Sequence, residues 1–306
     1  MTRKATIADC IGSTPMVTLN RITPENGAVI HAKLELFNPG GSLKDRTALG
    51  LIEEAENKGI LKPGITLVEA TSGNMGLGLA HLTASKGLRL VLVMSEKNRG
   101  MKSDLASSLG AELIFTPEDV PWDSGEGPLG VAEKLAETEP ETYYLNQFNN
   151  HANSNIHYRT TGSEIIDDTG GKVDVFVAGI GSGGTITGVA RRLKEVNPDV
   201  AVYGVAAVGS IFDVQHEKEG YIEGIGSDFL PGIYNADLVD KVLIVDPDRA
   251  IDYALNLLKM EGIPAGHSSG AVLAACFDVS KRHPGANIVA IMADTMRNYD
   301  YWRIKP

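Results

Sequence analysis

The sequence has few cysteines, no long apolar run and no excess of positive charge, and each absence excludes a class of protein. Cys10 and Cys276 are too few and too far apart for a disulfide framework or a thiolate metal site, so we expect reduced thiols in a cytoplasmic protein. No stretch approaches the roughly 18 apolar residues of a membrane-spanning helix. The N-terminus lacks the apolar core of a signal peptide. We therefore expect no membrane partner.

The charge balance argues against a nucleic-acid partner. Lys and Arg number 28 and Asp and Glu number 39, which gives a formal net charge of −11. Such a chain does not present the basic surface that nucleic acids or anionic membranes need. Its 306 residues, 43% of them hydrophobic, suffice for one large or two medium-sized globular domains.

Strand and helix patterns alternate from one end of the chain to the other. Apolar runs bounded by turn residues predict strands at 29–36, 66–70, 89–95, 111–117, 173–179, 200–208, 241–245 and 287–294. Amphipathic segments predict helices at 45–59, 76–87, 100–110, 131–140, 185–197 and 248–262. Strands that are apolar throughout are typical of parallel sheets covered on both faces, so we predict an α/β fold with mostly parallel sheets.

The segment GIGSGGTITG follows a predicted strand and opens a predicted helix. Gly179, Gly181 and Gly184 satisfy the dinucleotide fingerprint G-x-G-x-x-G. The next strand ends in Ala206–Val208 instead of the acidic residue that would hold a ribose. What remains is a run of small residues, Gly181–Thr185, that can wrap one phosphate at a helix N-terminus. Close packing of helix on strand is the other reading of these glycines.

Two further segments complete the candidate site. EATSGNMGLGLAHL, residues 69–82, joins a strand to a helix through a glycine-rich loop of the kind that brings N–H groups to an anion. In NPGGSLKDR, Lys44 follows a Gly–Gly turn. It is either a solvated surface lysine or a Schiff-base former. A lysine beside a loop that can bind a phosphate, such as Gly181–Thr185, is what the binding of pyridoxal phosphate needs.

Five ordered segments resemble the signature blocks of the cysteine synthase and cystathionine β-synthase family, fold type II of the pyridoxal-phosphate enzymes. They are NPGGSLKDR, EATSGNMGLGLA, YLNQFNNHANSNIHYRTTGSEI, GIGSGGTITG and GIPAGHSSGA. The similarity extends from about Ile11 to Tyr299. It implies two doubly wound domains: a smaller mobile domain at 39–147, which carries a substrate-carboxylate loop, and a larger phosphate-binding domain at 1–38 and 148–306. It also implies a homodimer.

The resemblance implies a role for individual residues. Lys44 would bind the cofactor covalently and then remove the substrate's α-proton. Asn74 would bind the cofactor's 3′ oxygen, and Ser268 would face its ring nitrogen. The cofactor phosphate would be held by Gly181, Ser182, Gly183, Gly184 and Thr185. The substrate carboxylate would be bound by Thr71, Ser72, Asn74, Met75 and Gln147. No metal is expected.

The implied reaction is β-elimination or β-replacement on a cysteine- or serine-type amino acid, through an aminoacrylate. Asp228, in GIGSDFLP, stands where cystathionine β-synthases usually have aspartate and cysteine synthases usually have glycine. It would activate water or a hydroxyl group as a general acid or base; capping of loop N–H groups is its other reading. We expect a lyase that forms serine and hydrogen sulfide from cysteine, or serine-dependent cystathionine β-synthase chemistry.

Alternatives stay open. One is a transferase of amino-acid biosynthesis, the O-acetylserine sulfhydrylase (cysteine synthase). A dehydratase would lack the QFNNHAN…HYRTTGSEI block, and Lys44 with a complete Gly181–Thr185 cup argues against a non-catalytic binding module. Several positions depart from the family pattern. Among them, Met75 replaces a threonine that helps bind the carboxylate, and His267 precedes Ser268 where isoleucine or glycine is usual. His267 would tune protonation near the ring or form a polar wall.

Overall fold

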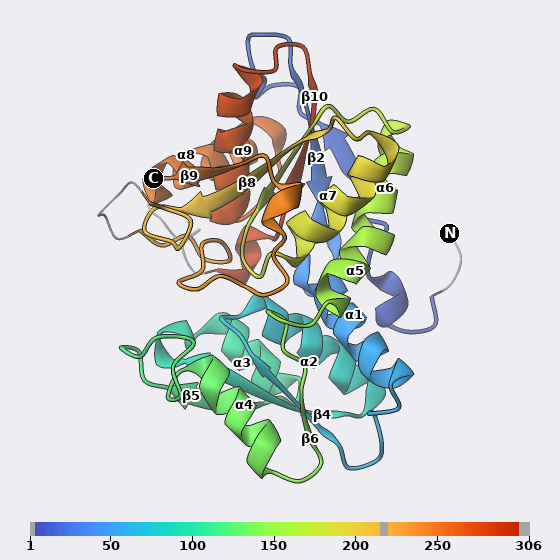
Figure 1. Ribbon diagram of the computed structural model, residues 1–306, viewed down its shortest axis with the longest axis vertical. Coiled ribbons are helices and arrows are strands. Elements are labelled where there is room, and N and C mark those ends of the chain that lie inside the picture. The colour runs from blue at the N-terminus through green and yellow to red at the C-terminus, as the bar shows by residue number, and fades with distance from the viewer. Residues whose placement is uncertain (1–3, 215–219, 300–306) are drawn as a thin grey trace.

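The computed structural model describes residues 4–214 and 220–299, in which two β-sheets lie one above the other along the long axis (Figure 1). The larger sheet has the order β1 (Met16–Thr18), β2 (Val29–Leu34), β10 (Asn287–Met292), β7 (Val175–Gly179), β8 (Ala201–Ala207) and β9 (Lys241–Val245). The smaller has the order β5 (Glu112–Thr116), β4 (Arg89–Ser95), β3 (Thr66–Ala70) and β6 (Thr142–Tyr144). Only the β1–β2 pair is antiparallel among these described strands. The predicted α/β fold with mostly parallel sheets is confirmed.

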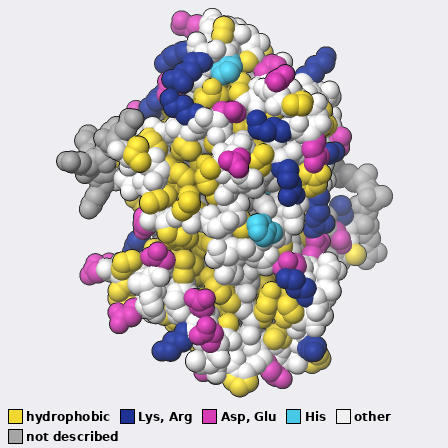
Figure 2. All heavy atoms as spheres, in the orientation of Figure 1, with side chains coloured by type: hydrophobic (Ala, Val, Ile, Leu, Met, Phe, Trp, Pro, Cys, Tyr) yellow, Lys and Arg dark blue, Asp and Glu magenta, His cyan; other side chains and the backbone are white. Residues whose placement is uncertain are grey.

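Helices cover both faces of each sheet. They are α1 (Lys44–Asn57), α2 (Asn74–Lys86), α3 (Met101–Ser108), α4 (Pro128–Thr138), α5 (Ala152–Arg159), α6 (Thr161–Thr169), α7 (Gly184–Val196), α8 (Pro247–Asn256) and α9 (His267–Ser280). A π-helix at Leu257–Glu261 extends α8. Within the described part of the chain, no helix is both long and apolar enough to cross a membrane. Positive and negative side chains are mixed over the face shown in Figure 2.

The alternation of side chains along each strand explains this layering. On β7, Val175 and Val177 pack into the core beneath α8 and α9, whereas Phe176 and Ala178 pack into the core beneath α6 and α7. Figure 1 shows these helix pairs on opposite sides of the larger sheet. Successive strand residues point to opposite faces, so a strand buried on both sides must be apolar throughout. That is the pattern read from the sequence.

Five of the strands and helices given above were not predicted: β1, β6, α5, α6 and α9. The strands β1 and β6 have only three residues each, too few to show a period. The helix α9 buries eleven of its fourteen residues and has no polar face, so it lacks the contrast that marks an amphipathic helix. All strands of the smaller sheet lie within the predicted 39–147 segment, and the motion of that segment as one body stays a prediction.

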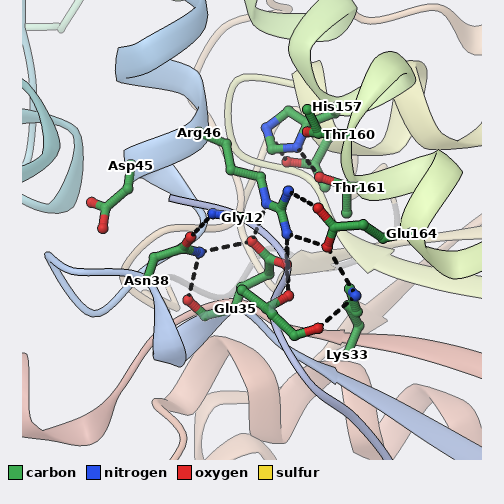
Figure 3. Close-up of polar contacts among 12 residues, drawn as sticks. Gly12, Lys33, Glu35, Asn38, Asp45, Arg46, His157, Thr160, Thr161 and Glu164 are labelled. Atoms are coloured by element: carbon green, nitrogen blue, oxygen red, sulfur yellow. Dashed lines mark hydrogen bonds and ion pairs between the residues drawn. The ribbon is translucent and has the colours of Figure 1, made fainter. Parts of the chain in front are cut away.

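A buried ionic network ties the start of α1 to the larger sheet (Figure 3). The Arg46 guanidinium donates from Nε to Glu35 Oε2 at 2.7 Å and from Nη1 to Glu164 Oε1 at 2.6 Å. The ammonium of Lys33 lies 3.0 Å from Glu164 Oε2. Burial raises the pKa of Glu164, but the hydrogen bonds and charge of Arg46 outweigh this effect and hold the pKa at about 2. The network joins α1, α6 and the segment after β2.

Removing Arg46 would leave the fully buried Glu35 without its countercharge. We predict that Arg46→Leu lowers the free energy of unfolding by about 3–5 kcal/mol, the usual cost of breaking a buried pair on one side. Urea denaturation of the full chain measures it. Arg159→Leu, which removes a half-exposed partner of Glu53, is the control and should have a much smaller effect. Equal effects of the two variants would contradict the account.

Candidate active site

Loops from both sheets meet around a cavity of about 190 Å³. The loops after β3, β6, β7 and β8 line it, together with Lys44 at the start of α1. A smaller cavity of about 30 Å³ shares Lys44, Gly181 and Ser182 with it and reaches Ser268. The carboxyl ends of parallel strands meet at one edge of a sheet, which is where ligands bind in such folds. Of the site residues predicted from the sequence, all except Gly184 line one of the two cavities.

Lys44 lies where the two cavities join. Its Nζ is 3.3 Å from Ser182 Oγ and 3.5 Å from Gln147 Oε1. Burial lowers the pKa of Lys44 to about 8, against the opposing charge of Glu69. A lowered pKa favours the uncharged amine, which is the form that attacks a carbonyl group or accepts a proton. The reading of Lys44 as a solvated surface lysine is wrong.

The loop from β7 to α7 forms a cradle without side-chain bulk. Gly183 has a φ of 82°, in the left-handed region that favours glycine. A Cβ on Gly181 would lie 2.5 Å from the carbonyl oxygen of Gly224, and a Cβ on Gly184 would lie 2.1 Å from Asn153 Oδ1. The first N–H groups of α7 have no partner within their own helix, so this cradle can bind an anion. Close packing and anion binding therefore both require these glycines.

The loop from β3 to α2 is shaped by the hydrogen bonds of Thr71 and by close packing at its glycines. The hydroxyl of Thr71 accepts hydrogen bonds from the N–H of Gly73 at 3.0 Å and of Gly76 at 3.3 Å, so only its own hydrogen is left for a ligand. A Cβ on Gly76 would lie 2.8 Å from Leu92, and a Cβ on Gly78 would lie 3.1 Å from the carbonyl oxygen of Lys44, which is a tight contact. Packing explains those two. From this loop, Thr71, Ser72, Asn74 and Met75 line the large cavity.

The amide of Asn74 is fixed by the C-terminal segment. Its Nδ2 donates to Asp294 Oδ2 at 2.7 Å, and its Oδ1 accepts from Asn298 at 3.3 Å. The hydroxyl of Tyr299 also donates to Asp294. Burial raises the pKa of Asp294 to about 6. Asp294, Asn298 and Tyr299 belong to the segment ADTMRNYDY, of which Asp300 and Tyr301 lie outside the described residues.

Gln147, Ser268 and Asp228 complete the predicted set. Gln147 donates from Nε2 to the carbonyl of Ala70 at 2.9 Å, which leaves its Oε1 facing Lys44. Ser268, near the start of α9, is buried and lines the smaller cavity. Asp228 lines the larger cavity beside Phe229, whose ring packs edge-on against Phe148 at 5.1 Å.

Glu69 is an ionisable residue close to Lys44 and Gln147 that the sequence reading missed. It belongs to β3, is fully buried, and accepts the N–H of Gln147 at 3.4 Å. Its Oε2 has no hydrogen-bond partner in the described part of the chain. Burial raises the pKa of Glu69 to about 8, and the charge of Lys44 opposes this shift. A glutamate within an otherwise apolar strand was the available signal.

His267 begins α9, beside Ser268. Its side chain is partly buried, and burial lowers its pKa to about 4, so the imidazole is neutral at pH 7. It is not among the described residues that line either cavity. Nor do the described residues include a cluster of His, Cys, Asp and Glu arranged to hold a metal ion.

We predict that His267→Ile keeps a sizeable fraction of the turnover of an amino-acid substrate, because the imidazole lies outside the cavity walls. Steady-state kinetics of the purified variant measures it. A loss of about 10³-fold, the size of a removed general acid or base, would place His267 in the chemistry instead.

Comparisons with known proteins show the family of this chain. Residues 7–294 match the family of the pyridoxal-phosphate dependent enzyme. Cystathionine beta-synthase of Apis mellifera is 40% identical over 97% of this chain, which spans about three-fifths (62%) of that protein. A probable cysteine synthase of Bacillus subtilis (strain 168) is 40% identical over 97% of both chains.

The structure of a hydrogen sulfide-producing enzyme from Fusobacterium nucleatum is also similar. It has a TM-score of 0.91 and 35% identity, over 98% of this chain and 99% of that one. Similarity of this extent covers both sheets and the loops between them. The chain therefore belongs to the pyridoxal-phosphate dependent enzyme family, and its cofactor is pyridoxal phosphate.

Proposed function

We propose that this protein catalyses β-replacement on cysteine, with water as the incoming group, and so forms serine and hydrogen sulfide. The C–S bond of cysteine breaks, a C–O bond forms, and the two hydrogens of water end on sulfide and on the new hydroxyl group. The observation that carries the proposal is the carboxylate of Asp228, which lines the same cavity as Lys44 and the Thr71–Met75 loop. The similar structure from Fusobacterium nucleatum, a hydrogen sulfide-producing enzyme, supports it.

The residues present fit pyridoxal phosphate. Lys44 would hold it covalently, and the Gly181–Thr185 cradle would hold its phosphate. Asn74 would donate to the 3′ oxygen the Nδ2 hydrogen that now points to the Tyr299 hydroxyl at 3.2 Å, and would keep its bond to Asp294. The hydroxyl of Ser268 would face the ring nitrogen. When bound, pyridoxal phosphate supplies an electron sink for the negative charge left on a substrate's α-carbon. The neutral Ser268 keeps that nitrogen largely unprotonated, which favours loss of the β-substituent.

The start of α2 would bind the substrate carboxylate. The hydroxyl hydrogen of Thr71 is available there, Ser72 lines the cavity, and helix N-terminal N–H groups attract anions. Gln147 would approach the carboxylate from the β6 side. Binding at this end holds the α-hydrogen toward Lys44, whose lowered pKa suits a proton acceptor.

Asp228 would act at the β-carbon. A carboxylate there takes a proton from water as the oxygen attacks, which makes water an effective nucleophile. The neighbouring Phe229 and its partner Phe148 supply an apolar wall beside the carboxylate. Such a wall limits the number of water molecules that reach the site.

A second candidate is addition of sulfide to O-acetylserine, as in a cysteine synthase. The probable cysteine synthase of Bacillus subtilis, which matches over 97% of both chains, favours it. Sulfide is already a strong nucleophile and needs no general base, so this reaction leaves Asp228 without a chemical role. The two candidates therefore differ in what Asp228 must do. A homodimer stays a prediction under both.

Lys44→Ala should abolish covalent attachment of the cofactor. We predict that the variant loses the visible absorption of the bound cofactor and all turnover. Among the described residues, Lys97 is the one other lysine that lines the larger cavity, and the smaller cavity beside the cradle has no lysine except Lys44. Borohydride reduction followed by peptide mapping identifies the attachment site. A reduced adduct at Lys97 or another lysine would show that the assignment to Lys44 is wrong.

Asp228→Asn should slow water addition while the removal of the α-proton by Lys44 continues. We predict that serine formation from cysteine falls by about 10²–10⁴-fold, the usual contribution of a general base. An added thiolate should still be captured at the β-carbon, because it needs no base. The measurement is the yield of serine, sulfide and thioether product in the two proteins.

Asp237→Asn, which changes an exposed aspartate outside both cavities, is the matched control and should keep full activity. Undiminished serine formation by Asp228→Asn would reduce Asp228 to a loop cap. It would also put the cysteine synthase candidate first.

A further inference from the structure

The helix α5 supports the cradle from behind. Asn153 and His157 lie one helical turn apart on α5, both are fully inaccessible to solvent, and neither lines a cavity. Each contacts a hydroxyl of the cradle: Asn153 reaches Ser182, and His157 reaches Thr185. Figure 3 shows His157 beside Thr161. Because neither residue lines a cavity, neither can touch a ligand directly. Any role in the site must therefore act through the residues that they contact.

The orientation of the Asn153 amide follows from its partners. Its nitrogen lies 2.8 Å from the carbonyl oxygen of Gln147, which can only accept, so Nδ2 must be the donor on that side. Nδ2 also donates to Ser182 Oγ at 2.9 Å. Its oxygen therefore faces Thr47, whose hydroxyl donates to it at 3.2 Å. Ser182 thus receives a hydrogen from Asn153, and its own hydrogen is left for the cavity.

The same reasoning fixes the tautomer of His157. Thr47 has already given its hydrogen to Asn153, so toward His157 Nε2, 3.2 Å away, its oxygen is an acceptor. Nε2 must then carry the ring hydrogen, and Nδ1 accepts from Thr161 at 2.9 Å. Burial, with the charges of Arg46 and Lys44, lowers the pKa of His157 and keeps the ring neutral.

Thr185 is therefore left with one direction in which to donate. Its Oγ1 lies 3.3 Å from His157 Nε2, which carries a hydrogen and cannot accept one. The hydroxyl hydrogen of Thr185 must turn elsewhere, and Thr185 lines the smaller cavity. Ser182 thus receives a hydrogen from the amide of Asn153, and Thr185 faces the single Nε2 hydrogen of His157, which Thr185 shares with Thr47. Both hydroxyl groups of the cradle keep their own hydrogens for a ligand.

We propose that Asn153 and His157 are positioning residues that turn the hydroxyl hydrogens of Ser182 and Thr185 toward the cofactor phosphate. A phosphate dianion offers only acceptors, so each hydroxyl must approach it as a donor. With the supply of hydrogens from α5, neither hydroxyl has to break a bond to the protein when the phosphate arrives. The inference rests on the proposed assignment of the phosphate to Gly181–Thr185.

The first experiment compares the affinity of the apoenzyme for pyridoxal phosphate and for pyridoxal, which lacks the phosphate. His157→Phe should weaken binding of pyridoxal phosphate by about 10- to 100-fold, the size of one hydrogen bond to a charged group, and leave binding of pyridoxal unchanged. His157→Gln, which keeps a donor near the Nε2 position, should restore most of the affinity. Thr83→Val, at a buried threonine bonded within α2, is the control and should change neither.

A double-mutant cycle tests whether His157 acts through Thr185. If it does, His157→Phe combined with Thr185→Val binds pyridoxal phosphate no more weakly than Thr185→Val alone. Additive losses, or equal losses for pyridoxal, would show that His157 only packs the helix and would overturn the proposal. If Ser182→Ala and Thr185→Val both left the ratio of the two affinities unchanged, the phosphate site itself would be wrongly assigned.

The tautomer can be observed without any change to the cradle. In ¹⁵N-histidine-labelled protein, the imidazole of His157, assigned with His157→Gln, should show a protonated Nε2 and an unprotonated Nδ1. The ³¹P signal of the bound cofactor should shift in His157→Phe and not in Thr83→Val. A protonated Nδ1 in the wild-type protein would overturn the proposal even if His157→Phe failed to fold.

Discussion

The rest of the site depends on the contacts of the Lys44 amino group with Ser182 and Gln147. Ser182 belongs to the loop after a strand of the larger sheet, and Gln147 to the loop after a strand of the smaller sheet. Lys44 can reach both because it begins the helix that passes from one sheet to the other. The buried pair of Arg46 and Glu35 anchors that helix two residues further on. The start of α1 therefore contributes both to the stability of the fold and to the geometry of the site.

Tight packing of α5 on α7 is the second constraint. A Cβ on Gly184 would meet Asn153, and a Cβ on Gly188 would lie 2.1 Å from the carbonyl oxygen of Ser154. Because α7 starts at the cradle, the absence of side chains on this face lets α5 reach the cradle from behind. The glycines of GIGSGGTITG thus serve the helix contact and the anion site together. This explains why a dinucleotide fingerprint can occur here without a dinucleotide site.

Much of the fold could be predicted from the sequence, because strands buried on both faces are apolar throughout and the helices between them are amphipathic. The helix α9 was not predicted, because burial on nearly all sides removes the contrast between an apolar and a polar face. The cradle, Lys44 and the β3–α2 loop could be found because their residue types carry chemistry directly. A glutamate in an apolar strand marks Glu69 in the sequence, but the roles of Glu69, Asn153, His157 and Asp294 could not be predicted, because they depend on contacts between segments far apart in sequence.

The central claim is that the site adds water to the β-carbon of cysteine. Incubation of the holoenzyme with cysteine in ¹⁸O-water, without sulfide or another thiol, tests it most directly. The account predicts serine that carries ¹⁸O in its hydroxyl group, with one sulfide released for each serine. Absence of labelled serine, with rapid formation of cysteine when O-acetylserine and sulfide are supplied, would contradict it.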